Sequence, residues 1–433
     1  MNNAFLKSIS VSNFGPFKDE IYFTTEVDNG KKEFLEKNTF EAKEHRYNKV
    51  SYIYGANAAG KSNFCKAVIQ IQKLIMLSPI IASNNPQLLE LKPFKDEVNA
   101  EINYFKFSKD CDKKPTSFGI EIIIDDILYN YSFEICNGKV VKEILTKKNK
   151  RTETILIRTS EKYEHITLKS ELATFKYNIT VVKENVLCLS MAAFLNNELA
   201  NKLVTAINDI KVLNMSSISG LRNFNQDEYN QEKIDDYLEI LKIAEPTITN
   251  LEVSFTESKV EKQKVGADDF ENRELIIKNI SIDVKSTHNV YENRRIVDEV
   301  ELPFLKIESN GTIKMFNIVP IISNVLSSGG ILIIDEIESG LHPNLVNMLI
   351  NFFYDDKINK FNAQLICTTH NTTLIENGIR RDQIWFVNKD ECGESDILRL
   401  SNILKEKNLN VRGGENIVQR YLEGAFGGIP NLS

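Results

Sequence analysis

The feature that most constrains the fold is the segment GANAAGKS at residues 55–62, which follows the pattern G-x-x-x-x-G-K-S. Residues 50–54 before it are β-branched and aromatic, as in a strand, and residues 63–76 after it carry apolar side chains at helical spacing. A glycine-rich turn between a strand and a helix points backbone N–H groups at an anion, near the positive end of the helix dipole. The pattern therefore predicts a phosphate-binding loop in an α/β fold.

Each residue type in this loop has a chemical role. The ammonium of Lys61 is suited to the β- and γ-phosphates of a nucleotide, and the hydroxyl of Ser62 is suited to Mg²⁺. A chance glycine-rich turn is the alternative, which the flanking strand and helix disfavour. We expect these residues to contact the nucleotide: Gly55, Ala56, Asn57, Ala58, Ala59, Gly60, Lys61, Ser62 and Asn63.

A second motif lies near residue 335. Four apolar residues, 331–334, read as a buried strand, and Asp335 and Glu336 follow directly. Asp335 would hold Mg²⁺ through water, because a hard cation prefers oxygen ligands. Glu336 would orient and deprotonate the attacking water. Alone, the motif could be a strand that ends in exposed acids, but with the loop it predicts a nucleotide site.

Two further segments fit the same site. ESNGT at residues 308–312 opens a helix over 309–325, where Ser309 and Gly311 would offer a hydroxyl and backbone N–H groups to an anion. Taken alone, this is an ordinary helix cap. His370 follows a strand at 364–368 and could sense a γ-phosphate by hydrogen bonding, although a lone histidine is usually structural.

Composition gives no sign of a nucleic-acid-binding, membrane-spanning or secreted protein. The net charge of −7 gives no global sign of nucleic-acid binding, and the basic cluster at 147–151 is interpreted as a solvated hairpin tip. No apolar run is long enough to cross a membrane, and the first residues lack the pattern of a signal peptide. The six cysteines are scattered, as in reduced thiols, so we expect a cytoplasmic protein.

The order of these patterns predicts four segments. They are 1–100 and 301–433 as the two parts of the nucleotide core, 101–190 as a β-rich part, and 191–300 as a helical and β insertion. In the insertion, helices are expected over 191–210 and 227–244 and a polar loop over 257–272. Strands are expected in the β-rich part over 102–107, 118–124, 127–135, 140–146, 154–157 and 177–182.

Together, the motifs resemble the ABC-type ATPase head of the SMC/RecF/OLD group. GANAAGKS resembles its Walker A motif, ESNGT its signature, ILIIDE its Walker B and CTTHN its switch-histidine motif, and SNFGPFKD at the start resembles its first strand. The resemblance implies an α/β fold, with an ABC-type P-loop nucleotide-binding core, an antiparallel β subdomain and a helical insertion. It also implies ATP hydrolysis with Mg²⁺, with Lys61, Glu336 and His370 as catalytic residues.

A narrower resemblance is to the standalone ATPases of bacterial phage-defence operons, of the Septu, PARIS and abortive-infection type. LKPFKDE at 91–97 and the ending VRGGENIVQRYLEGAFGGIP at 411–430 carry it. The residues after His370 are too few for the nuclease domain of OLD proteins and lack a clear acidic cluster. The resemblance therefore implies a sensor or regulatory ATPase whose effector, a nuclease for example, is a separate chain.

The sequence also departs from that pattern. The glutamine that usually follows the Walker A helix is not clear: Gln87 is in range, and LKPFKDE is the alternative for its role. The signature has Glu308 and Ser309 in place of its leading Leu-Ser. Both departures predict slow hydrolysis or a switch that is held in the ATP-bound form.

In ABC heads, the Walker A of one subunit and the signature of the other enclose the same ATP. We therefore expect an ATP-dependent homodimer or a higher oligomer, with residues 191–245 as a docking surface for the effector or as a solvated bundle. One alternative is a RecF-like DNA-repair ATPase on duplex DNA, against which the net charge counts mildly. Another is a binding protein that uses nucleotide only to stabilise its fold, against which Glu336 and His370 count.

Overall fold

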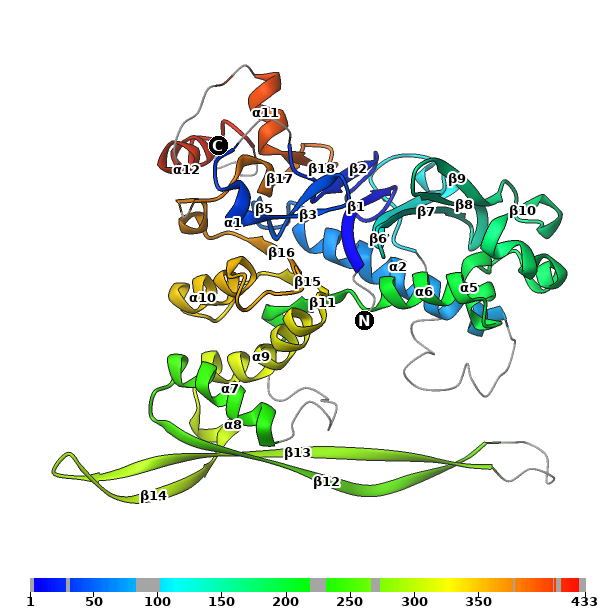
Figure 1. Ribbon diagram of the computed structural model, residues 1–433. Helices are drawn as coiled ribbons and strands as arrows, with labels where there is room; N and C mark the ends of the chain where they lie inside the picture. The colour runs from blue at the N-terminus through cyan, green and yellow to red at the C-terminus, as the bar shows by residue number, and fades with distance from the viewer. Residues whose placement is uncertain are drawn as a thin grey trace. The chain divides into compact units, whose positions relative to one another are not determined.

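The computed structural model divides into two compact units, which are described separately (Figure 1). The first comprises residues 1–213, 325–337 and 347–433, and the second comprises 214–324 and 338–346. The structure describes residues 4–28, 32–82, 102–218, 231–265, 273–376, 378–407, 409 and 414–427.

A six-stranded sheet forms the centre of the first unit. Its spatial order is β11 (Lys211–Asn214), β15 (Ile331–Asp335), β16 (Gln364–Thr369), β5 (Val50–Gly55), β17 (Ile384–Lys389) and β18 (Ser395–Arg399). β15, β16, β5 and β17 run parallel, and β18 is antiparallel to β17. Every residue of β5, β15 and β16 is buried, as expected for strands covered on both faces.

Helix α2 (Lys61–Ala82) leaves this sheet directly after β5. Its apolar side chains recur at helical spacing and are part of one large core cluster. The buried members are Phe64, Cys65, Ala67, Val68, Ile71 and Ile75. The predicted strand–loop–helix context of residues 50–76 is therefore present.

A seven-stranded antiparallel sheet supplies another large part of that core. Its order is β10 (Ile166–Leu168), β9 (Thr152–Arg158), β8 (Lys139–Lys148), β7 (Ile127–Cys136), β6 (Thr116–Ile124), β1 (Ala4–Ser12) and β2 (Ile21–Thr24). The turn at Asn137 and Gly138 has φ of +50° and +72°, as a two-residue hairpin requires. The basic cluster at 147–151 lies at the β8–β9 hairpin tip, where Lys147 pairs with Glu171.

The remaining helices and strands of the first unit are short. A two-stranded sheet consists of β3 (Thr39–Ala42) and β4 (His45–Asn48), preceded by α1 (Leu35–Asn38). Its other helices are α5 (Cys188–Phe194), α6 (Glu198–Asn208), α11 (Leu400–Glu406) and α12 (Gly414–Leu422), and α10 (Pro343–Tyr354) lies largely in it. Its 3₁₀ turns are Cys111–Lys113, Tyr163–His165, Ser170–Val181, Thr372–Glu376 and Arg381–Gln383.

Three sequence-based expectations in the first unit are wrong. Residues 102–107 form no strand; their backbone instead bonds to the β1–β2 turn, through Phe105 N–H to Asn13 Oδ1 and Gly15 N–H to Asn103 O. Residues 177–182 lie mostly in a 3₁₀ segment. The helix expected over 191–210 breaks into α5 and α6, because Asn196 has φ of +62° and Asn197 caps α6.

The second unit is organised around an antiparallel ribbon of three strands, β12 (Ile248–Val265), β13 (Arg273–Glu292) and β14 (Arg295–Pro303). α7 (Gln231–Ala244) precedes it, and α8 (Phe304–Ile307), α9 (Asn310–Ser328) and the 3₁₀ turn Met215–Ser217 complete the described elements. The polar loop expected over 257–272 is wrong at 257–265, since β12 continues there and its ladder with β13 needs only backbone groups. Residues 266–272 lie outside the described part.

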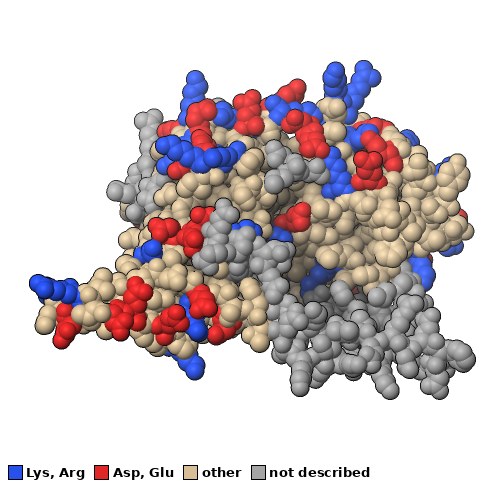
Figure 2. Space-filling view, turned by 60° about the horizontal axis from the view of Figure 1, so that its bottom comes forward, with Lys and Arg blue, Asp and Glu red and all other residues tan. Residues whose placement is uncertain are grey.

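Charges of both signs lie together on the β13–β14 hairpin, at the lower left of Figure 2. Its exposed charged residues include Glu292, Arg294, Arg295, Asp298, Glu299 and Glu301. Among the described side chains of this hairpin, no basic stripe of the kind that tracks a nucleic-acid backbone is present. Among the described residues, no helix is both long and apolar enough to cross a membrane.

Candidate nucleotide-binding site

The glycine-rich loop joins β5 to α2, and two of its glycines are required by its geometry. Gly60 has φ of +123°, a conformation that L side chains rarely adopt. A Cβ at Gly55 would lie 2.7 Å from the carbonyl oxygen of Val387 in β17. Asn57 and Ala58 are exposed at the turn, and Ala58 also has a positive φ, of +61°. The loop therefore presents its backbone at the surface from a tightly packed base.

Two residues distant in sequence support this base. Ser395 Oγ donates to Ala59 O at 2.6 Å, and Ser395 N–H donates to Pro16 O at 2.8 Å. A Cβ at Gly60 would lie 3.2 Å from both Pro16 Cγ and Ser395 Oγ. The sequence analysis missed Ser395, because it follows a turn between two ordinary strands and nothing local links it to the loop.

Lys61 and His370 meet beside the loop. The ammonium of Lys61 donates to Gly55 O at 2.8 Å and to Ala56 O at 2.9 Å, and it lies 3.4 Å from His370 Nδ1. The Lys61 residue is only 5% exposed, so its charge is held close to the loop backbone. Phosphate oxygens would be stronger partners for this ammonium than neutral carbonyl groups are.

The acidic motif lies at the same edge of the sheet. Asp335 ends β15 and is 2% exposed, and its Oδ1 accepts a hydrogen bond from Thr368 Oγ1 at 2.7 Å. Thr368 Oγ1 in turn accepts from the N–H of Glu336 at 2.8 Å. Since β5, β15 and β16 are parallel, their carboxyl ends meet at one edge, where ligands of α/β sheets bind. Lys61, Asp335, Glu336 and His370 are therefore brought together.

Ser62 and Asn63 occupy the first turn of α2 and are partly exposed. Within the described residues, no group of three or more histidine, cysteine and acidic side chains is placed to hold a metal ion. In a magnesium–nucleotide site, Mg²⁺ keeps several waters and takes phosphate oxygens with only one or two protein ligands. Ser62 and Asp335 fit those two positions.

Ser309 and Gly311 lie in the second unit, at the start of α9. Ser309 Oγ accepts from Thr312 N–H at 3.1 Å, so Ser309 caps the helix. A Cβ at Gly311 would lie 3.2 Å from Gly340 O, which places residues 339–343 (SGLHP) against this helix start. Glu308, just before Ser309, has its Oε1 atom 2.9 Å from His288 Nε2, a contact that the sequence analysis missed.

The C-terminal tail packs against the sheet. The ring of Tyr421 in α12 stacks on Phe386 in β17, with centroids 5.0 Å apart, and Phe426 stacks on Phe386 at 5.5 Å. Tyr54, next to the glycine-rich loop, meets Tyr421 at 6.0 Å. The described tail residues therefore pack against β17 and against β5, the strand that leads into the loop. Gln87 and the LKPFKDE segment lie outside the described residues.

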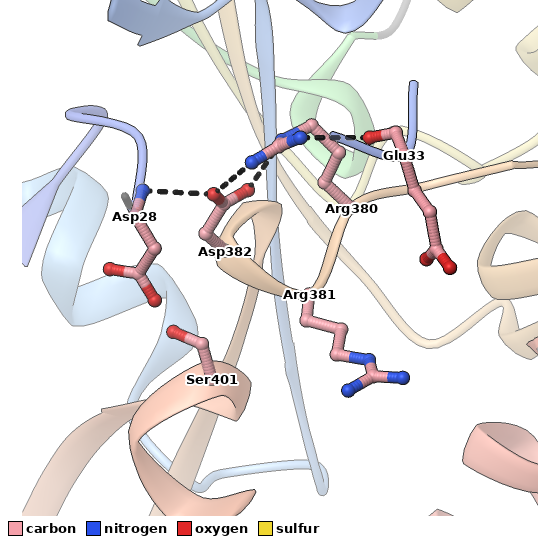
Figure 3. Close-up of a pocket in the computed structure, with 6 residues that line it drawn as sticks. All are labelled: Asp28, Glu33, Arg380, Arg381, Asp382 and Ser401. Atoms are coloured by element: carbon pink, nitrogen blue, oxygen red, sulfur yellow. Dashed lines mark hydrogen bonds and ion pairs between the residues drawn. The ribbon is translucent and has the colours of Figure 1, made fainter. Parts of the chain in front are cut away.

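A polar pocket lies at the opposite edge of the six-stranded sheet, where β17 begins (Figure 3). Arg380 makes a two-point ion pair with Asp382, at 3.0 and 2.7 Å, and also donates to Glu33 O. Asp28 N–H donates to Asp382, and the Asp28 carboxylate pairs with Arg399. The charges of these four side chains neutralise one another. Their bonds join the N-terminal segment to the sheet, and the pocket lies at the other end of the strands from the glycine-rich loop.

Comparison with known proteins agrees with this geometry. Residues 50–376 match the family model described as "AAA domain, putative AbiEii toxin, Type IV TA system". The matched range begins at β5, ends just after His370 and includes both acidic residues. No curated protein matches the chain. Because the match extends over well more than half of the chain, the protein belongs to this family of AAA domains and has an AAA/ABC-like P-loop ATPase core.

Proposed function

We propose that the protein binds ATP with Mg²⁺ at the loop of residues 55–63 and hydrolyses it. The observation that carries this proposal is the convergence of Lys61, Asp335, Glu336 and His370 at one sheet edge. Lys61 would exchange its carbonyl partners for β- and γ-phosphate oxygens, and backbone N–H groups of the loop would hold the remaining phosphate oxygens. Mg²⁺ held by Ser62 and, through water, by Asp335 would neutralise phosphate charge.

The proposed reaction is in-line hydrolysis. A water oxygen forms a bond to the γ-phosphorus while the bond from that phosphorus to the β–γ bridging oxygen breaks, which releases ADP and phosphate. The Glu336 carboxylate takes the proton from the water. His370 hydrogen-bonds to the γ-phosphate and so distinguishes ATP from ADP.

We also propose that two copies enclose ATP, with Ser309 and Gly311 of one copy facing the phosphates bound by the other. The support is the resemblance of ESNGT to a signature motif and the cap geometry of α9, which leaves helix N-terminal N–H groups for an anion. Neither half-site would be complete alone, and an isologous pairing gives two nucleotides per dimer.

Glu336→Gln tests both parts of the proposal. It should keep ATP binding, abolish phosphate release and accumulate an ATP-bound dimer, measured by light scattering after gel filtration. Lys61→Ala is the matched control, since it should lose nucleotide binding and remain in the nucleotide-free assembly. Phosphate release by Glu336→Gln at the parent rate would remove Glu336 as the base.

For the biological role, we propose a sensor or regulatory ATPase of a phage-defence system that controls a separate effector. The resemblance of the tail and the family description, which names a toxin–antitoxin system, support it. Cells that carry the gene with its neighbours should plate phage less efficiently, and Lys61→Ala should restore plating. Equal plating by both, with ATPase activity that duplex DNA stimulates in a steeply salt-dependent way, would favour a repair ATPase instead.

The exposed helical part of residues 191–245 is the proposed docking surface for the effector. α5 is almost wholly buried and α6 buries one face, whereas α7 shows a charged exposed face. Charge reversal at Asp235 and Asp236 should weaken a complex with the effector more than charge reversal at the exposed Glu198 of α6. Unchanged affinity in both variants would place the effector elsewhere.

A further inference from the structure

Thr368 bonds to both acidic residues of the site, to the carboxylate of Asp335 and to the backbone of Glu336, and its side chain is completely buried in β16. We propose that Thr368 is a positioning residue that orients Asp335 toward Mg²⁺ and Glu336 toward the attacking water. The inference rests on the proposed function. Thr368 lies in the CTTHN segment, but the sequence analysis gave a role there only to His370.

The hydrogen bonds of this hydroxyl have a fixed direction. Thr368 Oγ1 lies 2.7 Å from Asp335 Oδ1 and 2.8 Å from Glu336 N. An ionised carboxylate only accepts and a backbone N–H only donates, so the single hydroxyl proton must point to Asp335. The hydroxyl therefore fixes the position of one carboxylate oxygen of Asp335, and with it the orientation of the carboxylate.

The backbone of Glu336 needs this support. Its φ is +55°, in the left-handed region, which is unfavourable for a non-glycine residue. Two bonds from Thr368 hold it there: the hydroxyl accepts from Glu336 N–H, and the carbonyl accepts from Ile337 N–H at 3.2 Å. Because φ sets the direction in which a side chain leaves the backbone, Thr368 also sets the position of the proposed base.

A buried threonine could serve packing alone, and the two roles predict different results. Thr368→Val keeps the shape but removes the hydroxyl, which leaves Asp335 Oδ1 and Glu336 N–H without this partner. Loss of a group that orients a metal ligand typically costs about 10- to 100-fold in metal affinity or activity. A packing role predicts a change in stability with no change in the Mg²⁺ dependence.

The test compares purified full-length variants in steady-state ATPase assays and in fluorescent-nucleotide titrations over a range of Mg²⁺. Thr368→Val should lower kcat about 10- to 100-fold and raise the Mg²⁺ concentration for half-maximal activity, with metal-free nucleotide affinity unchanged. Thr368→Ser keeps the hydroxyl and should restore both values to within about 3-fold. Thr116→Val is the matched control, because it removes a buried hydroxyl that bonds only to Asn13 O.

Three outcomes would overturn the inference: a folded Thr368→Val variant with parental kcat and Mg²⁺ dependence, a Thr368→Ser variant as defective as Thr368→Val, or an equal Mg²⁺ shift in Thr116→Val. If Thr368→Val does not fold, Thr368→Cys, whose S–H is a weaker donor, should give an intermediate Mg²⁺ shift. If the parent binds nucleotide but does not hydrolyse it, the proposed function fails, and the Mg²⁺-dependent binding titration still tests Thr368.

Discussion

The side-chain amide of Gln364 pairs with both backbone groups of Leu6. Leu6 N–H donates to Gln364 Oε1 at 2.7 Å, and Gln364 Nε2 donates to Leu6 O at 3.1 Å, across a sequence separation of 358 residues. Gln364 starts β16 of the six-stranded sheet, and Leu6 lies in β1 of the seven-stranded sheet. Both residues are buried, so the amide completes a strand-like pairing that joins the two sheets.

Gln364→Leu should therefore destabilise the first unit by about 2–4 kcal/mol, because it leaves two buried backbone groups without this partner. Urea unfolding followed by tryptophan fluorescence measures it, since the single tryptophan, Trp385, is 3% exposed in the core of the same unit. Gln419→Leu is the matched control, as that amide makes an exposed bond to Glu423. Equal midpoints for the two variants would contradict this role of Gln364.

Glu143 predicts a pH dependence of stability. Its carboxylate is fully buried and accepts from the N–H groups of Cys188 and Leu189 and from Tyr131 OH, at 2.8 to 2.9 Å. Burial raises the pKa of Glu143 above its ordinary value, although these bonds and the charge of Arg158 oppose the shift. The folded protein therefore binds a proton that the unfolded chain has released, over the window between the two pKa values.

Across that window, the free energy of unfolding should fall as the pH rises from the ordinary glutamate pKa through the raised one, and it should level off above. The glutamine of Glu143→Gln cannot ionise, so this variant should lose the slope. It should also be less stable by an amount that does not depend on pH, because the amide NH2 faces backbone N–H donors. Urea midpoints of the two proteins at a series of pH values measure the difference. Parallel curves would show that Glu143 titrates in the folded protein as it does in the unfolded chain.

Local patterns were sufficient to predict the glycine-rich loop, the acidic strand and the helix start at 309, because each is encoded within about ten consecutive residues. The contacts of Ser395 with the loop, of Thr368 with the acids and of Gln364 with Leu6 could not be predicted, since each joins segments that meet only in the folded chain. The composition of residues 177–182 predicted a strand, but most of them belong to a 3₁₀ segment. Leu172 and Phe175, earlier in that segment, are buried three residues apart, as on one face of a helix.

Gly60→Ala should abolish nucleotide binding while the protein stays folded. A methyl group there would meet Pro16 and Ser395 at 3.2 Å, and φ of +123° is unfavourable for alanine, so the loop backbone would shift. Gly138→Ala is the matched control, because Gly138 also has a positive φ, of +72°, but a methyl group there meets nothing within 4 Å. Fluorescent-nucleotide titration should show loss of affinity only in Gly60→Ala, and equal affinities would remove the tight packing of Gly60 as a requirement.

Nucleotide should stabilise the first unit through Lys61. A ligand that binds only the folded state adds about 2.7 kcal/mol at a concentration of 100 times its Kd, so Mg²⁺ and ATP should raise the unfolding midpoint reported by Trp385. Lys61→Ala should remove this shift, because the ammonium beside Gly55 O and His370 is the charge placed to meet the phosphates. Lys66→Ala, which changes an exposed lysine five residues further along α2, should keep it. A shift of the same size in Lys61→Ala would mean that nucleotide binds elsewhere in the protein.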